Sequence, residues 1–174
     1  MTQVGGLSAA NVASGANLAN YLLSYAGTRS VFVGACVGIQ AGFGYGNSGV
    51  GDSALQAITT ASFNTAEGFH ALKANTIGSS NTALGFAALL VNASGDNNTA
   101  VGFQTLISNT SGYHNIAIGT QTLYNNTTAT YNTAIGFHAL YYNSSGQNNT
   151  GIGLYALYAN VSGGKNIAFG VSAG

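Results

Sequence analysis

Polar, small and apolar residues alternate along this chain in a pattern that repeats every 17 residues. Each repeat opens on a segment of the form Asn-Thr-Ala-x-Gly, and the side-chain period of two within it is typical of a short β-strand. Ser30 opens one copy in the same register, and a looser copy, NVASG, begins 19 residues earlier at Asn11. The regular copies then begin at Asn47, Asn64, Asn81, Asn98, Asn115, Asn132, Asn149 and Asn166.

Three more positions of the repeat are nearly invariant when it is numbered from its first residue. Position 5 is always Gly, which indicates a bend with positive φ or a close backbone approach. Position 9 is Leu in seven successive repeats, and position 4 is apolar except at Glu67. The glycines include Gly68, Gly85, Gly102, Gly119, Gly136 and Gly153; the leucines are Leu55, Leu72, Leu89, Leu106, Leu123, Leu140 and Leu157; position 4 includes Val50, Leu84, Val101, Ile118, Ile135, Ile152 and Phe169.

Two short extended segments separated by Gly-rich and Asn-rich turns predict an all-β fold, a parallel β-solenoid or β-roll with one coil per repeat. Helical hairpin repeats usually need about twice this length. We expect about nine to ten coils stacked about 4.8 Å apart, so that equal positions form ladders, Leu on Leu inside and Asn on Asn at the corners. Residues 30–174 form the regular solenoid, and residues 1–29 form an N-terminal segment with a degenerate first coil. A short helix within residues 8–25 is the alternative for that segment, because Leu18, Leu22 and Tyr25 share a helical face.

Position 3 is almost always Ala or Gly in the regular repeats, which predicts a narrow interior with position 3 inside and position 4 outside. An outward apolar stripe over nine turns is a surface that a monomer rarely leaves in water. We therefore expect the position-4 residues to form a subunit interface, most simply around a threefold axis.

Charge is almost absent, with three basic and three acidic residues and a net charge of zero. Nucleic-acid binding needs clustered Lys and Arg, so neither nucleic acid nor an anionic membrane is expected as a partner. No apolar run is long enough for a membrane span, and the first residues do not resemble a signal peptide. A protein of near-zero charge tends to associate.

Residues that carry chemistry are scattered, so we expect no catalytic, metal or cofactor site. Asp52, Glu67 and Asp96 occupy different repeat positions and form no carboxylate pair. His70 and His138 share position 7 but lie four coils apart, too far for one metal ion. The remaining candidates also have structural interpretations. His114 lies at another corner, and Cys36 is predicted to be a small buried hydrophobic residue. The Gly-rich segment 42–49 lacks the lysine of a phosphate loop, and Glu67 is either simply exposed or paired with Lys73.

Three ladders leave binding functions open. Tyr124, Tyr141 and Tyr158 share position 10, where they form either a subunit seam or a glycan-binding surface. Thr at position 2 is reminiscent of ice-binding solenoids, although Ile116 and Ile167 interrupt it. Asn-x-Ser sequences begin at Asn92, Asn109, Asn143 and Asn160, and they accept glycans only in a glycosylating compartment.

The NTAxG turns, with their x-A-L and N-x-S-G segments, resemble the repeats of phage tail-fibre shafts and of trimeric autotransporter adhesin heads, over about residues 30–174. The resemblance implies a left-handed parallel β-roll, commonly a homotrimer, that projects from a virion or cell surface and serves attachment. Adhesins of that type carry a signal peptide, a stalk and an anchor, and many tail fibres carry a C-terminal tip or chaperone; none is visible in this sequence. Receptor binding therefore does not follow from the resemblance alone.

The sequence begins with about half a coil before Asn11 and stops after position 9 of its last repeat. We expect the N-terminal segment of one copy to complete the last coil of the next, a head-to-tail contact that does not close. A fragment cut from a longer fibre would have similar ends. The sequence thus predicts a non-enzymatic, fibre-forming structural protein of the extracellular space or virion surface, whose main partner is itself. A tail-fibre or adhesin shaft that binds cell-surface glycans is the first alternative, and an ice-binding solenoid is the second.

Overall fold

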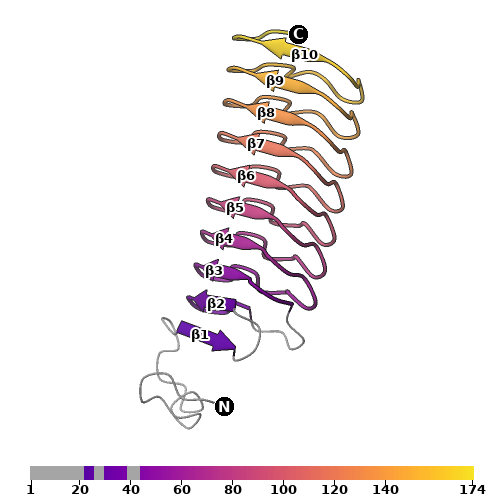
Figure 1. Cartoon of the computed structure of the whole chain (residues 1–174). Helices are drawn as coiled ribbons and strands as arrows, with labels where there is room; N and C mark the ends of the chain where they lie inside the picture. Colours follow the sequence, from indigo (N-terminus) through magenta and orange to yellow (C-terminus); the bar gives the residue numbers. More distant parts are fainter. Residues whose placement is uncertain (1–21, 26–29, 39–43) are drawn as a thin grey trace.

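A single ten-stranded sheet organises the computed structural model, which describes residues 22–25, 30–38 and 44–174. The strands follow one another in chain order, one per coil, and the coils stack into an elongated solenoid with β1 and β10 at opposite ends (Figure 1). The strands are β1 (Leu22–Tyr25), β2 (Ser30–Val33), β3 (Ser48–Val50), β4 (Thr65–Glu67), β5 (Thr82–Leu84), β6 (Thr99–Val101), β7 (Ile116–Ile118), β8 (Thr133–Ile135), β9 (Thr150–Ile152) and β10 (Ile167–Phe169).

The nine strands from β2 to β10 are parallel and bound eight complete coils. Each residue pairs with the residue 17 positions further on, as Thr65 does with Thr82 and Ala66 with Ala83. The predicted β-solenoid with one coil per repeat is therefore confirmed. The looser copy at Asn11 lies outside the described residues.

The N-terminal edge of the parallel sheet is covered by β1, which pairs antiparallel with β2 through Leu22↔Val33 and Tyr25↔Ser30. The helix considered for residues 8–25 is thus wrong at residues 22–25, where sheet pairing prevails over the helical spacing of Leu22 and Tyr25. Residues 8–21 lie outside the described part.

Bends with positive φ close each coil, and they explain the invariant glycine. Gly68 has a φ of 135°, and a Cβ there would come within 2.5 Å of the carbonyl oxygen of Gly85 in the next coil. Three further positions of each coil are left-handed without being glycine, for example Ala87, Leu89 and Asn97 with φ of 54°, 52° and 55°. Such residues are normally disfavoured in this region, so the packing of neighbouring coils must hold them there.

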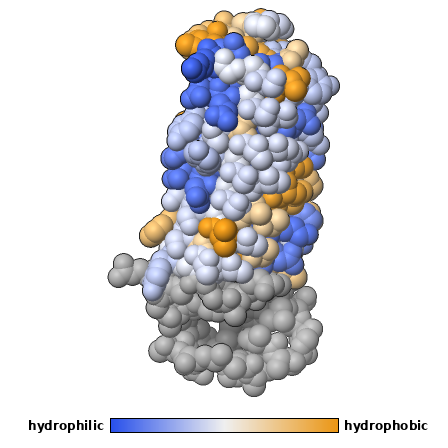
Figure 2. All heavy atoms as spheres, turned by 90° about the vertical axis from the view of Figure 1, so that its right-hand side faces the viewer, coloured by the Kyte–Doolittle hydropathy of each residue, from blue (hydrophilic) through white to orange (hydrophobic). Residues whose placement is uncertain are grey.

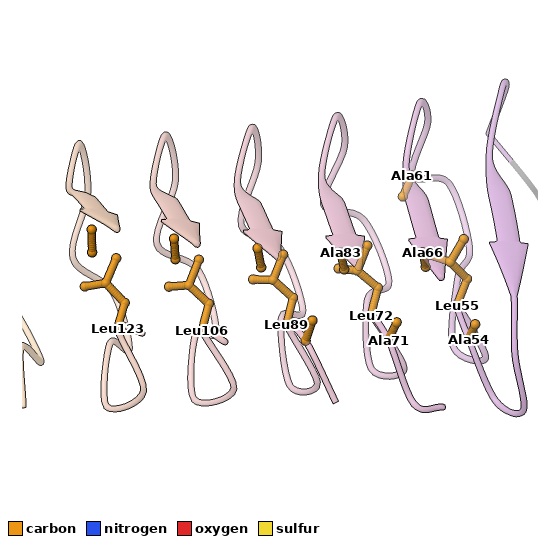
Figure 3. Close-up of a cluster of buried hydrophobic side chains, with 14 of the residues drawn as sticks. Ala54, Leu55, Ala61, Ala66, Ala71, Leu72, Ala83, Leu89, Leu106 and Leu123 are labelled. Carbon is orange, nitrogen blue, oxygen red and sulfur yellow. The ribbon is translucent and has the colours of Figure 1, made fainter. Parts of the chain in front are cut away.

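Leucine and alanine fill the interior. The leucines of position 9 are buried and form a continuous column with the alanines of positions 3 and 8. In Figure 3, Leu55, Leu72, Leu89, Leu106 and Leu123 take the same orientation in successive coils. Position 3 is buried in every strand from β3 to β10 while positions 2 and 4 are more exposed, so the predicted inward orientation of position 3 is confirmed.

Candidate functional site

A buried ladder of asparagines at position 1 connects successive coils. Asn81 Nδ2 donates to Asn64 Oδ1 at 3.1 Å and to the carbonyl oxygen of Gly95 at 2.8 Å. The backbone N–H of Asn81 also donates to Asn64 Oδ1, at 2.9 Å. Position 1 therefore lies inside the coil, where each amide satisfies groups of its own coil and of the preceding one.

A second buried asparagine ladder runs through position 12, where the sequence predicted only a turn. Asn92 Nδ2 donates to Asn75 Oδ1 and to the carbonyl oxygen of Gly95, both at 2.9 Å. The signal was present, because position 12 is Asn in six successive repeats. The asparagines of the sequons at Asn92, Asn109 and Asn143 have no exposed surface, so the folded solenoid has no room for a glycan on them. Asn160 continues the same ladder.

The apolar residues of position 4 face outward, as predicted. Val50, Ile118 and Phe169 are exposed, whereas Leu84, Val101, Ile135 and Ile152 are half-buried. One side of the solenoid shows separate hydrophobic patches among weakly polar and hydrophilic residues (Figure 2). The orientation of position 4 agrees with a subunit interface, which remains a prediction.

Position 6 holds an outward column of large apolar side chains that the repeat pattern did not predict. Phe69, Phe86, Phe103, Phe137 and Leu154 are each 41 to 46% exposed. The first three rings stack, with centroids 5.5 Å apart between Phe69 and Phe86 and 5.2 Å apart between Phe86 and Phe103. The repeated Gly-Phe pair at positions 5 and 6 was the available signal, but Asp52 and Thr120 interrupt the column.

The tyrosines of position 10 do stack on one another. The ring centroids are 5.1 Å apart between Tyr124 and Tyr141 and 5.5 Å apart between Tyr141 and Tyr158. Tyr142 stands nearly perpendicular to both neighbouring rings, at 83° to Tyr141 and 70° to Tyr158, and Tyr155 stands at 85° to Tyr158. A hydrogen bond with Tyr142 raises the pKa of Tyr158, and burial raises the pKa of Tyr141. This arrangement presents both ring faces and hydroxyl groups at the surface of the C-terminal coils.

His138 lies against the same aromatic cluster. Its Nε2 is 2.7 Å from Gln121 Oε1, its ring centroid is 3.8 Å from that of Phe137, and its buried Nδ1 has no hydrogen-bond partner among the described residues. Burial lowers the pKa of His138. For His70, burial and the nearby Lys73 ammonium lower the pKa; Lys73 Nζ lies 3.5 Å from His70 Nε2.

The other candidate residues do not converge on a site. Within the described ranges, no group of three His, Cys, Asp or Glu side chains is placed to hold a metal ion. Cys36 is exposed, so its prediction as a buried residue was wrong. Its φ of 53° turns position 7 outward, while Val37 at position 8 fills the interior. Glu67 is exposed, and residues 44–49 of the Gly-rich segment fit the repeat register, with Asn47 on the buried ladder.

No helix in the described part of the chain is long and apolar enough to cross a membrane. A scan against protein-family models, a search of curated proteins and a search of solved structures each found no match to this chain. Its candidate functional surfaces are therefore those that its own geometry defines: the two edges of the sheet, the outward columns at positions 4 and 6, and the aromatic cluster of the C-terminal coils.

Proposed function

We propose that this chain is a structural, fibre-forming protein that assembles with further copies of itself, end to end, into a filament. The observation that carries the proposal is the ten-stranded sheet, in which every described coil is hydrogen-bonded to the next, and in which β1 and β10 each have one neighbouring strand among the described residues. Unpaired strand edges favour pairing with another chain. The edges are unlike, because β1 is antiparallel and β10 parallel to its neighbour, so a contact between them is heterologous and leaves new edges free.

The last coil offers the groups with which each preceding coil binds its successor. In the coil before, the N–H of Thr150 donates to the carbonyl oxygen of Asn166 at 2.8 Å, and Asn149 Oδ1 accepts from the backbone and side chain of Asn166. Ile167 and Asn166 hold the corresponding positions in the last coil, and no described coil follows them. A second copy that supplies these partners would extend the asparagine ladder as well as the sheet.

Low charge supports the same proposal. Three positive and three negative residues among 174 provide little repulsion between copies. Ile167, Phe169 and Val171 of the last coil are 65 to 72% exposed, and their burial would favour association.

The experiment is cryo-electron microscopy of the untagged chain at moderate concentration, with a variant that blocks one edge. Ile167→Pro removes the N–H that points away from β9 but keeps the bonds between β9 and β10, since Asn166 accepts and Gly170 donates there. Long filaments from the original chain and short rods from Ile167→Pro would support the proposal. The matched control is Ile167→Thr, which places at position 2 the residue found there in most coils. Short rods from all three chains would refute end-to-end assembly.

A glycan-binding shaft of the tail-fibre or adhesin type is the second candidate, favoured by the aromatic cluster around Tyr141. Exposed ring faces beside hydroxyl groups suit the apolar and polar faces of a pyranose ring. This candidate would be favoured over the structural filament if the chain forms only short rods and binds a glycan array, and if Tyr142→Ala and Tyr155→Ala abolish that binding without altering the rods.

A further inference from the structure

The outward columns at positions 4 and 6 form one apolar surface around the glycine corner of each coil. Four apolar position-4 side chains, each followed by a Phe or Leu at position 6, are half-buried, whereas Glu67, followed by Phe69, is exposed; the four are Leu84, Val101, Ile135 and Ile152. Val50 beside Asp52 and Ile118 beside Thr120 are exposed instead. We define the apolar ridge as the position-6 column Phe69, Phe86, Phe103, Phe137 and Leu154 together with the position-4 residues Leu84, Val101, Ile118, Ile135 and Ile152.

The ridge has a notch one coil wide. Thr120 replaces the large side chain of position 6 between Phe103 and Phe137, and the neighbouring Ile116 and Ile118 are 42% and 38% exposed. Because Thr is smaller than Phe, the row of large apolar side chains is interrupted at this coil, between Phe103 and Phe137.

The residues of the ridge carry no charge. Glu67 at position 4 and Asp52 at position 6 lie at its N-terminal end, next to Phe69, whereas between residues 68 and 164 the charged residues are Lys73 at position 10 and Asp96 at position 16, outside the ridge. The position-6 side chains, about two-fifths exposed, contribute on the order of 400 Å² of surface. With the position-4 column added, the ridge approaches the roughly 800 Å² per partner of a stable interface.

We propose that the apolar ridge is a lateral seam where a second copy of this chain packs, with a position-6 ring of one copy in the notch of the other. The period of the ridge identifies the partner. Successive rings of Phe69, Phe86 and Phe103 are 5.2 to 5.5 Å apart, and a surface packs continuously against such a column only if it has the same coil spacing. The solenoid itself has that spacing. The seam deepens the proposed function, since it supplies the side-by-side contact between filaments that grow end to end.

The test is carried out on the Ile167→Pro chain, whose end-to-end growth is blocked, by sedimentation velocity over a range of concentrations. A discrete lateral oligomer is expected, and the added pair Phe86→Gln and Phe103→Gln should weaken it by at least about 30-fold. The matched control is Phe63→Gln, because Phe63 is 65% exposed at position 17, away from the ridge. Equal oligomerisation of the ridge variant and the control would overturn the seam.

The variant Thr120→Phe distinguishes specific packing at the seam from non-specific association of apolar surfaces. If a partner ring occupies the notch, filling it from within weakens association although it adds apolar surface. Stronger association would overturn the notch. Circular dichroism and hydrogen exchange first verify that each variant retains its coils.

The two proposals fail in different ways. The unmodified chain could form filaments that are only one solenoid wide, with the same width in the Phe86→Gln and Phe103→Gln variant. That result would reject the seam but keep the fibre. Lateral oligomers that depend on the ridge, without any long filament from the unmodified chain, would reject the fibre but keep the seam.

Discussion

Two interior columns of this solenoid keep one residue type, whereas the outward columns at positions 6 and 10 vary from coil to coil. Position 9 is Leu from Leu55 to Leu157, and position 12 is Asn from Asn75 to Asn160. At position 6, by contrast, Asp52 and Thr120 replace Phe, and position 10 changes from Gln56 and Lys73 through two aliphatic residues to tyrosines. An interior side chain contacts its own copies above and below, so a change in one coil disturbs two others. An outward side chain has solvent on one side and is free to acquire a surface function.

The largest effect that tests this comparison is expected from Leu106→Ala. Leu106 has no exposed surface and packs in the column of position 9, so the substitution leaves a cavity and should lower the free energy of unfolding by about 3 kcal/mol. Phe103→Ala in the same coil removes a larger side chain that is 46% exposed, and it should lower stability by about 1 kcal/mol. Denaturant unfolding of both variants, kept as short rods by Ile167→Pro, measures the difference. Equal losses of unfolding free energy in the two variants would mean that the ridge contributes as much to stability as the interior.

The next effect comes from the buried asparagines. Asn109 Nδ2 donates to Asn92 Oδ1 at 2.7 Å and to the carbonyl oxygen of Gly112 at 3.0 Å, and Asn109 Oδ1 accepts from Asn126 at 2.8 Å. Asn109→Ala removes all three bonds and leaves the buried Asn92 Oδ1 without this donor, whereas the Gly112 carbonyl oxygen still accepts from Asn98 Nδ2 and Asn126 Nδ2 still donates to Ala129. The change should cost about 2 kcal/mol.

Asn97→Ser is the matched control for Asn109→Ala. Asn97 is exposed, and Ser80 already occupies the equivalent position with positive φ, so the change should remain within about 0.5 kcal/mol. Hydrogen exchange of the coils around each site provides the readout. Similar loss of protection in both variants would show that the ladder contributes no more than an exposed turn.

The fold was accessible from the sequence because the solenoid stacks equal positions, so the 17-residue period reveals both the coil and its ladders. The orientation of single positions was less accessible. Cys36 was expected inside because its neighbours in the sequence are apolar, but the left-handed residue at position 7 turns outward, and positions 8 and 9 both point inward. The Asn of position 12 resembles a turn residue because its neighbours form a turn. The apolar ridge was not predicted because Asp52 and Thr120 interrupt the large side chains of position 6.

The stacked tyrosines should have a smaller effect than the buried asparagines. Tyr141 lies between Tyr124 and Tyr158, and Leu90 already fills the same position in an earlier coil. Tyr141→Leu should therefore preserve the coil and cost about 1 kcal/mol through lost ring contacts. Tyr45→Leu, at a ring that is 61% exposed, is the control and should cost less. Denaturant unfolding of both variants tests this order, and an equal cost would show that the stack adds nothing to stability.

The smallest expected effect is a loss of stability in mild acid that depends on His138. Burial lowers the pKa of His138 below its ordinary value of 6.5, so the unfolded chain takes up the proton more readily than the folded chain. Stability should therefore be unaffected by this group well above pH 6.5, and it should fall as the pH drops through 6.5 and then through the lower folded pKa.

His138→Gln should remove this part of the pH dependence while keeping an amide beside Gln121, because Gln104 and Gln121 already pair at 2.9 Å at the same position. His70→Gln is the companion variant, because the pKa of His70 is lowered as well, by burial and by Lys73. Thermal unfolding between pH 8 and pH 5 compares the three chains. An unchanged acid response in His138→Gln would assign the acid sensitivity to groups outside the aromatic cluster.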